Sequence, residues 1–109
     1  MRRHVMGQLE RFDVIVTPTQ PAGAPVIQSE TGLDSKQAVM SQFFGIRSHR
    51  SPFNLAGTPA MAVPCGFTKE GLPMSIQIAG KPFDENTLFQ VGHAYQERTD
   101  WHDRRPRLD

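Results

Sequence analysis

Hydrophobic and polar positions follow two different periods along the chain, and each period predicts a different kind of element. Near the start, apolar positions recur at helical spacing with charged residues between them, which predicts a helix over residues 1–11. Similar apolar stripes follow an expected cap at 34–44 and at 84–99. A short stretch with Pro near its start and Gly at its end predicts a further helix over 51–57.

Strict alternation of period two marks the stretches PAMAVPCGF and MSIQIAG, which predict strands over 59–67 and 73–80. On the first strand the bulky side chains fall on one face, and Ala, Pro and Gly leave the other face bare. The bulky residues are Met61, Val63, Cys65 and Phe67. A continuous apolar run predicts a third strand over 12–17, covered on both faces.

These elements predict an α/β fold, a mixed sheet with helices, in one domain over residues 1–109. A Pro-rich loop over 18–33 has few polar residues, so we expect it to line another surface and not to lie in open solvent. Ser51 and Asp84 are the expected N-caps, while the stretch RTDWHDRRPRLD is expected to fray. The first helix has no N-cap residue before it, which is a hint of a fragment.

Charge and cysteine content narrow the function classes. The chain has 109 residues and a formal net charge of +1, which argues against nucleic acid as the main partner. Arg104, Arg105 and Arg107 are interpreted as a solvated terminus. One cysteine, Cys65, excludes an internal disulfide and fits a reducing compartment. With neither a signal peptide nor an apolar run of membrane-spanning length, we expect a cytoplasmic protein without a membrane partner.

The stretch SPFNLAGTPAMAVPCGF has no charged residue in a chain that is 21% charged. Its small residues are consistent with the wall of a cleft, and equally with a helix packed tightly on the sheet. Candidate nucleophiles are weak: Cys65 sits at an apolar strand position, and Ser48, His49 and Ser51 lack an orienting acid. The histidines lack metal-ligand spacing. We therefore expect no complete catalytic set, no metal site and no cofactor.

Several of these stretches resemble one known family. DVIVTPT, SPFNLAGTPAMAVPCGF and GLPMSIQIAGKPFDENTLFQVGHAYQ resemble, in order and spacing, the C-terminal third of the amidase signature family. The resemblance covers about residues 1–106. Its members are serine amide hydrolases with a Ser–cis-Ser–Lys triad, and one of the subunits of an amidotransferase is among them. The resemblance implies that this chain is a C-terminal segment of the larger amidase-signature α/β fold.

The resemblance also implies what is present and what is missing. No GGSSGG-like stretch occurs, and the lysines Lys36, Lys69 and Lys81 lie outside the catalytic motif. The chain alone is therefore expected to be inactive, with the triad in a missing N-terminal amidase region and an amide as substrate of the whole enzyme. The residues implied to shape the substrate pocket are Thr17, Pro18, Thr19, Phe53, Asn54, Gly57, Pro59 and Gln77. Thr58 and Ser75 depart from the family pattern at places that would tune pocket size.

Two other interpretations stay open. In the first, the chain is a stand-alone binding or oligomerisation module that reuses the fold. Strands taken from a larger sheet expose apolar edges, and such edges are expected to pair with a second copy or with a partner. A Cys65-dependent enzyme would instead require rapid, selective alkylation of that thiol at neutral pH.

Overall fold

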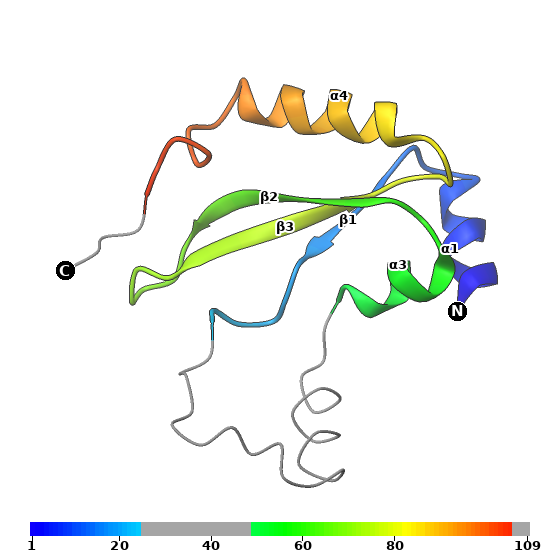
Figure 1. Ribbon diagram of the computed structural model, residues 1–109, viewed down its shortest axis with the longest axis horizontal. Helices are drawn as coiled ribbons and strands as arrows, with labels where there is room; N and C mark the ends of the chain where they lie inside the picture. Colours follow the sequence, from blue (N-terminus) through cyan, green and yellow to red (C-terminus); the bar gives the residue numbers. More distant parts are fainter. Residues whose placement is uncertain (25–48, 106–109) are drawn as a thin grey trace, which may run out of the picture.

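The computed structural model describes residues 1–24 and 49–105. The elements follow the order α1 (Arg2–Leu9), β1 (Ile15–Pro18), α3 (Ser51–Ala56), β2 (Ala60–Phe67), β3 (Pro73–Ala79) and α4 (Glu85–Gln96). The helix predicted over 34–44 lies outside the described residues. The fold class is confirmed, because helices pack on a sheet in the described part of the chain (Figure 1).

The three strands pair in the order β1-β3-β2, and both pairs are antiparallel. Ile15 lies opposite Ala79 at one end of β1, and Pro18 lies opposite Ile76 at the other. The hairpin of β2 and β3 closes through residues 68–72, where the Thr68 N–H donates to the Leu72 carbonyl (2.8 Å). In this described sheet β3 is the central strand. The two edge strands, β1 and β2, are far apart in the sequence.

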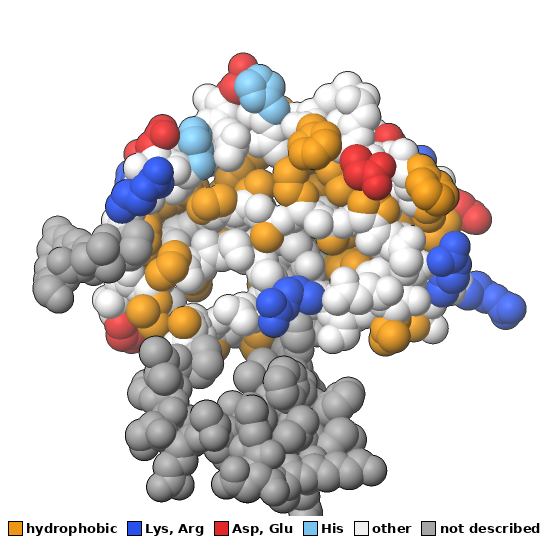
Figure 2. All heavy atoms as spheres, in the orientation of Figure 1, with side chains coloured by type: hydrophobic (Ala, Val, Ile, Leu, Met, Phe, Trp, Pro, Cys, Tyr) orange, Lys and Arg blue, Asp and Glu red, His pale blue; other side chains and the backbone are white. Residues whose placement is uncertain are grey.

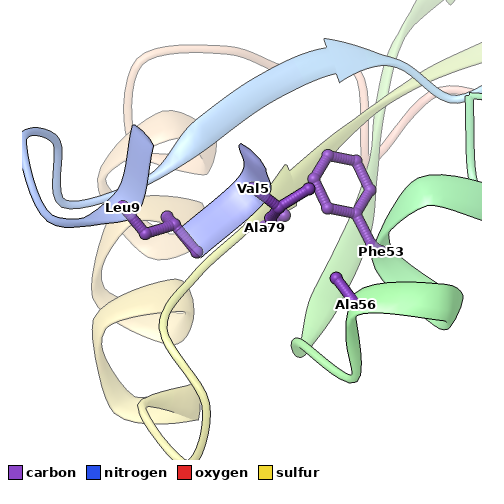
Figure 3. Close-up of a cluster of buried hydrophobic side chains, with 5 residues drawn as sticks. All are labelled: Val5, Leu9, Phe53, Ala56 and Ala79. Carbon is purple, nitrogen blue, oxygen red and sulfur yellow. The ribbon is translucent and has the colours of Figure 1, made fainter. Parts of the chain in front are cut away.

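Helix α4 covers one face of the sheet, while α1 and α3 lie on the other side (Figure 1). On the α4 side, Leu88 packs with Val63 and Ile78. On the opposite side, a buried cluster joins α1, α3 and the end of β3 (Figure 3). Its members are Val5, Leu9, Phe53, Ala56 and Ala79. Burial of these apolar side chains is the main driving force that fixes the helices on the sheet.

Two local features define the end of α3, and one of them joins it to α1. Gly57 ends α3 in the left-handed conformation (φ 66°, ψ 43°), which glycine adopts without steric cost. The Arg2 guanidinium donates to the Ala56 carbonyl (2.5 Å), one of the carbonyl groups that the end of a helix leaves unpaired. The C-terminal turn of α3 is thus tied to the first turn of α1.

Some local predictions were wrong. Strand β1 begins at Ile15, and Val16 is exposed, so the run is not covered on both faces. Ser51 is the first residue of α3, whose N-cap is Arg50 without a side-chain cap. Asp84 is the N-cap residue of α4, as predicted, although its carboxylate accepts from the Thr87 hydroxyl (2.8 Å) and makes no cap bond to the backbone.

The segment after α4 is also better ordered than expected. The Trp101 ring meets Phe67 edge-on, with 6.5 Å between ring centroids. The Arg104 guanidinium lies over Trp101 at 4.5 Å and donates to the Asp100 carboxylate (2.8 Å). Fraying was predicted over 98–109, and these contacts hold the described part of that stretch in place. In the part of the chain that the structure describes, no helix is long and apolar enough to cross a membrane.

Candidate functional site

A row of uncharged polar side chains crosses the face of the sheet that the sequence predicted to be bare. Strand pairing places Thr17 of β1 directly opposite Gln77 of β3, so both side chains project from the same face. Ala62 of β2 lies opposite Gln77 on its other side and is exposed. The polar row thus joins β1 and β3 at this level, and the small side chain of Ala62 continues the same face onto β2.

Gln77 is the centre of this row. Its side chain is buried, with 4% of its surface exposed, and its Nε2 donates to the Thr17 hydroxyl (2.9 Å) and to the His49 carbonyl (2.6 Å). Because a carbonyl only accepts, the His49 contact requires that the nitrogen of the carboxamide face it. Both N–H groups of Gln77 are thus engaged, and the side chain links β1, β3 and the segment before α3.

A second pair lies one step along the same face. The Ser75 hydroxyl donates to the Thr19 hydroxyl (2.8 Å), and the Thr19 backbone N–H donates to the Ser75 carbonyl (3.1 Å). Thr19 is itself buried. These bonds fix the first residue beyond β1 against β3, so the start of the Pro-rich loop leaves the sheet at a defined place.

The remaining predicted site residues lie on α3, at its end, or at the end of β1. Phe53 is buried in the cluster with Val5 and Leu9, so packing accounts for its position. The Pro59 carbonyl accepts from the Gly80 N–H (3.1 Å), which joins the segment after α3 to the end of β3. Asn54 and Pro18 are exposed. Substrate contact by any of these residues stays a prediction.

The structure gives hydrogen-bonding roles to Ser75, which was predicted only to tune pocket size, and to the His49 carbonyl, which was not predicted. Ser75 is the partner of Thr19, and the backbone carbonyl of His49 is the second acceptor for Gln77. The alternation of Ser75, Gln77 and Ala79 on one face of β3 was the available signal for Ser75. The His49 contact depends on how α3 is placed over the sheet, which no local pattern encodes.

Cys65 does not have the surroundings of an activated nucleophile. It is half-buried at a register shift between Pro64 and Gly66, where β2 has one more residue than β3. Burial raises the pKa of its thiol above the ordinary value, which disfavours the thiolate. Ser51 is exposed at the start of α3, and Ser48 lies outside the described residues. Within residues 1–24 and 49–105, no three His, Cys, Asp or Glu side chains gather as metal ligands would.

Comparisons with known proteins agree on one family. A family model described as Amidase matches residues 1–89. The A subunit of the glutamyl-tRNA(Gln) amidotransferase of Geobacillus kaustophilus (strain HTA426) is 43% identical over 108 residues, which are 99% of this chain and 21% of that protein. Its counterpart in Chloroflexus aurantiacus (strain ATCC 29366 / DSM 635 / J-10-fl) is 63% identical over 98 residues, 90% of this chain and 19% of that protein.

The fold has a close counterpart among solved structures. The structure of 6-aminohexanoate cyclic dimer hydrolase superposes with a TM-score of 0.71 at 27% identity, over 97% of this chain and 24% of that chain. The chain thus spans about a fifth of the length of the curated relatives it matches.

Proposed function

Because this chain belongs to the amidase family, we propose that it is the C-terminal segment of an amide hydrolase and forms one wall of the substrate pocket. The observation that carries the proposal is the buried Gln77 carboxamide, which ties Thr17 and the His49 carbonyl together on a sheet face of small uncharged residues. A wall of this kind positions an amide by shape and hydrogen bonds without adding charge.

The wall would consist of two parts with different roles. Exposed small side chains of β2 (Ala60, Ala62 and Pro64) would face the substrate, because they leave room beside the sheet. The hydrogen-bonded row of Thr17, Thr19, Ser75 and Gln77 would hold that face in shape. Thr17, Pro18, Thr19, Phe53, Asn54, Gly57, Pro59 and Gln77 remain the proposed lining residues.

Catalysis would depend on residues outside this chain. In the whole enzyme a serine hydroxyl would attack the amide carbonyl, the amine would leave with a proton, and water would hydrolyse the acyl-serine. Within the described residues, Lys69 and Lys81 are exposed in turns. Burial raises the pKa of the Cys65 thiol, which disfavours its thiolate. The chain covers only 19–21% of its relatives. We therefore propose that the isolated chain has no amidase activity.

The relatives suggest which kind of amidase is involved. Identity to the two amidotransferase proteins is 43% and 63%, against 27% for the cyclic dimer hydrolase. This difference favours a parent protein of the amidotransferase type over a hydrolase of small cyclic amides.

A chimera tests the pocket assignment. The 98 matched residues of the Chloroflexus aurantiacus relative would be replaced by the corresponding residues of this chain, and glutamine hydrolysis would be measured as released ammonia. We expect the chimera to be active and its Ala62→Phe variant to lose at least about tenfold in kcat/KM, because the new ring fills the space beside the sheet. Lys69→Phe, in the exposed turn after β2, is the matched control. Equal activity of the two variants would exclude Ala62 from the pocket wall.

The isolated chain tests the second part of the proposal. It would be incubated with simple aliphatic and aryl amides, and separately with a serine-directed fluorophosphonate. We expect neither amide turnover nor labelling. Turnover or stoichiometric labelling of a serine in the pure chain would contradict the assignment of the nucleophile to another part of the enzyme.

A further inference from the structure

The turn between β3 and α4 holds an aromatic residue in a backbone conformation that favours glycine. The Asp84 N–H donates to the Lys81 carbonyl (3.1 Å), which closes a four-residue turn with Pro82 second and Phe83 third. Phe83 has φ of 63°, as the third residue of a type II turn requires. Glycine or asparagine usually occupies this place, because a side chain there is strained. Phe83 is thus an unfavourable residue for the turn itself.

The ring of Phe83 makes no compensating contribution to the described core. It is 95% exposed, the largest exposure among the bulky apolar residues in the described part of the chain. The described fold therefore buries almost none of this ring, while the turn carries the strain of its backbone. A partner surface that covers the ring would supply the missing stabilisation.

Two other exposed aromatic residues lie at the same end of the fold. The pairing of Ile15 with Ala79 brings the chain just before β1 next to the chain just after β3 (Figure 1). Phe12, 53% exposed, precedes β1, and Phe89, 66% exposed, lies in the second turn of α4. In Figure 2 hydrophobic side chains reach the surface along α4 and at the end where α4 begins. Phe12, Phe83 and Phe89 are called the aromatic end below.

The comparisons show that similar proteins contain much more polypeptide than this fold. The solved neighbour contains this fold over 97% of our chain, yet the fold makes up only 24% of that protein. The curated relatives are about five times as long as the matched segment. Further polypeptide of this amount is available to contact the fold in the similar proteins, and an exposed, strained aromatic side chain is suited to be an anchor for it.

We infer that the aromatic end is a docking surface for the remaining part of an amidase-family polypeptide, with Phe83 as its anchor residue. The inference rests on the proposed function for the identity of the partner. It goes further in naming the surface and the residue on which association depends. It also predicts that association does not require a covalent link between the two parts, because the binding energy resides in side chains of the folded segment.

Association in trans tests this inference. The full 109-residue chain, tagged, would be co-expressed with the Chloroflexus aurantiacus relative from which the 98 matched residues are deleted, and the affinity would be measured on the purified components. We expect co-purification in a 1:1 ratio. Phe83→Gly, which fits the turn but removes the ring, should weaken the Kd at least about tenfold. Failure of the unaltered chain to co-purify would overturn the inference.

Control variants separate loss of the anchor from loss of the fold. Phe83→Asn is a second variant that tolerates positive φ, and it should weaken binding as Phe83→Gly does. Leu72→Ala changes an exposed apolar residue at the opposite end of β3 and should leave the Kd unchanged. Circular dichroism would verify that each variant is folded. Equal binding by Phe83→Gly and the unaltered chain would overturn the role of Phe83.

Two further readouts distinguish this inference from its alternatives. Sedimentation equilibrium of the chain alone should give a monomer, and a dimer that Phe83→Gly dissociates would identify a second copy as the occupant and overturn the inference. Amide hydrolysis by the two-part complex is measured separately. Tight, Phe83-dependent binding without hydrolysis would support the docking surface while contradicting the proposed function.

Discussion

The Nε2 of Gln77 lies 2.9 Å from the Thr17 hydroxyl oxygen, across a strand pair in which these two residues are directly opposite. The same nitrogen donates to the His49 carbonyl, which belongs to the segment that leads into α3. One buried carboxamide thus sets the relative positions of β1, β3 and α3. The proposed pocket wall depends on these positions, so Gln77 acts on the wall by positioning it.

Replacing Gln77 should therefore destabilise the fold. Gln77→Leu removes two hydrogen bonds and leaves the His49 carbonyl and the Thr17 hydroxyl without this donor. We expect a loss of about 2–3 kcal/mol in the free energy of unfolding, since each bond contributes about 1 kcal/mol and unpaired buried groups add a penalty. Urea unfolding measured by the fluorescence of Trp101, the single tryptophan, would show this loss. Gln90→Leu, on the exposed face of α4, should change stability by less than about 0.5 kcal/mol.

The alternation of residue types predicted much of this row but not its full connectivity. Gln77 and Ser75 were expected to share a face because β-strands have a period of two, and the register bears this out. Alternation on β2 holds from Ala60 to Pro64 and is broken at Cys65, where the strand gains an unpaired residue. A bulge of this kind depends on pairing with β3, so a pattern read along one strand does not contain it.

Local sequence patterns also did not predict where α3 begins, the conformation of the turn before α4, or the contact made by Trp101. Ser51 has the chemistry of an N-cap, yet α3 includes it and begins after Arg50. Phe83 occupies a turn position where composition favours glycine, so its conformation is set by the closure between β3 and α4. Trp101 is held by Phe67, which lies 34 residues earlier in the chain, and nothing near Trp101 in the sequence signals that contact.

Two glycines on helices should respond to alanine to different extents. Gly7 lies on α1, and a Cβ placed there would have no atom within 4 Å. Gly7→Ala should raise the free energy of unfolding by about 0.5–1 kcal/mol, because alanine loses less entropy on entering a helix. Gly92 lies on α4 against the end of the flexible Met61 side chain, which must move when a Cβ is added, so Gly92→Ala should gain less stability than Gly7→Ala. Equal stabilisation of both variants in urea unfolding would show that Met61 does not restrict this place.

Cys65 should react slowly with alkylating reagents. Burial raises the pKa of its thiol, so the reactive thiolate is scarce at pH 7. We expect iodoacetamide to modify the folded chain at least about tenfold more slowly than the urea-unfolded chain. The folded chain should also show a rate profile that rises at a higher pH than that of the unfolded thiol. Rapid, selective modification at neutral pH would revive the interpretation of Cys65 as a nucleophile.

The contact between Trp101 and Arg104 should be lost only in acid. The Arg104 guanidinium lowers the pKa of Asp100 by donating to its carboxylate. Because folding lowers this pKa, the contribution of the pair is complete above the ordinary carboxyl value and is lost as the pH falls through the lowered one. Trp101 fluorescence should therefore stay constant down to about pH 4 and change below it. Asp100→Asn should show the altered emission at neutral pH, whereas Asp103→Asn should not.

Identical substitutions at two exposed phenylalanines should change stability in opposite directions. Phe83 has a positive φ, so Phe83→Gly relieves about 1–2 kcal/mol of backbone strain. The greater freedom of glycine in the unfolded chain costs about 0.5–1 kcal/mol, which leaves a net gain of up to about 1.5 kcal/mol. Phe89 lies within α4, where Phe89→Gly weakens the helix and should cost up to about 1 kcal/mol.

Urea unfolding of the two variants decides whether Phe83 stabilises its own turn. A loss of stability in Phe83→Gly equal to that in Phe89→Gly would mean that the Phe83 ring contributes to the fold of the isolated chain. A gain in stability together with weakened association would mean that this residue is retained at a cost to the turn. Its contribution would then lie in the contact that covers the ring, and the strain at Phe83 would mark the surface where the rest of the enzyme docks.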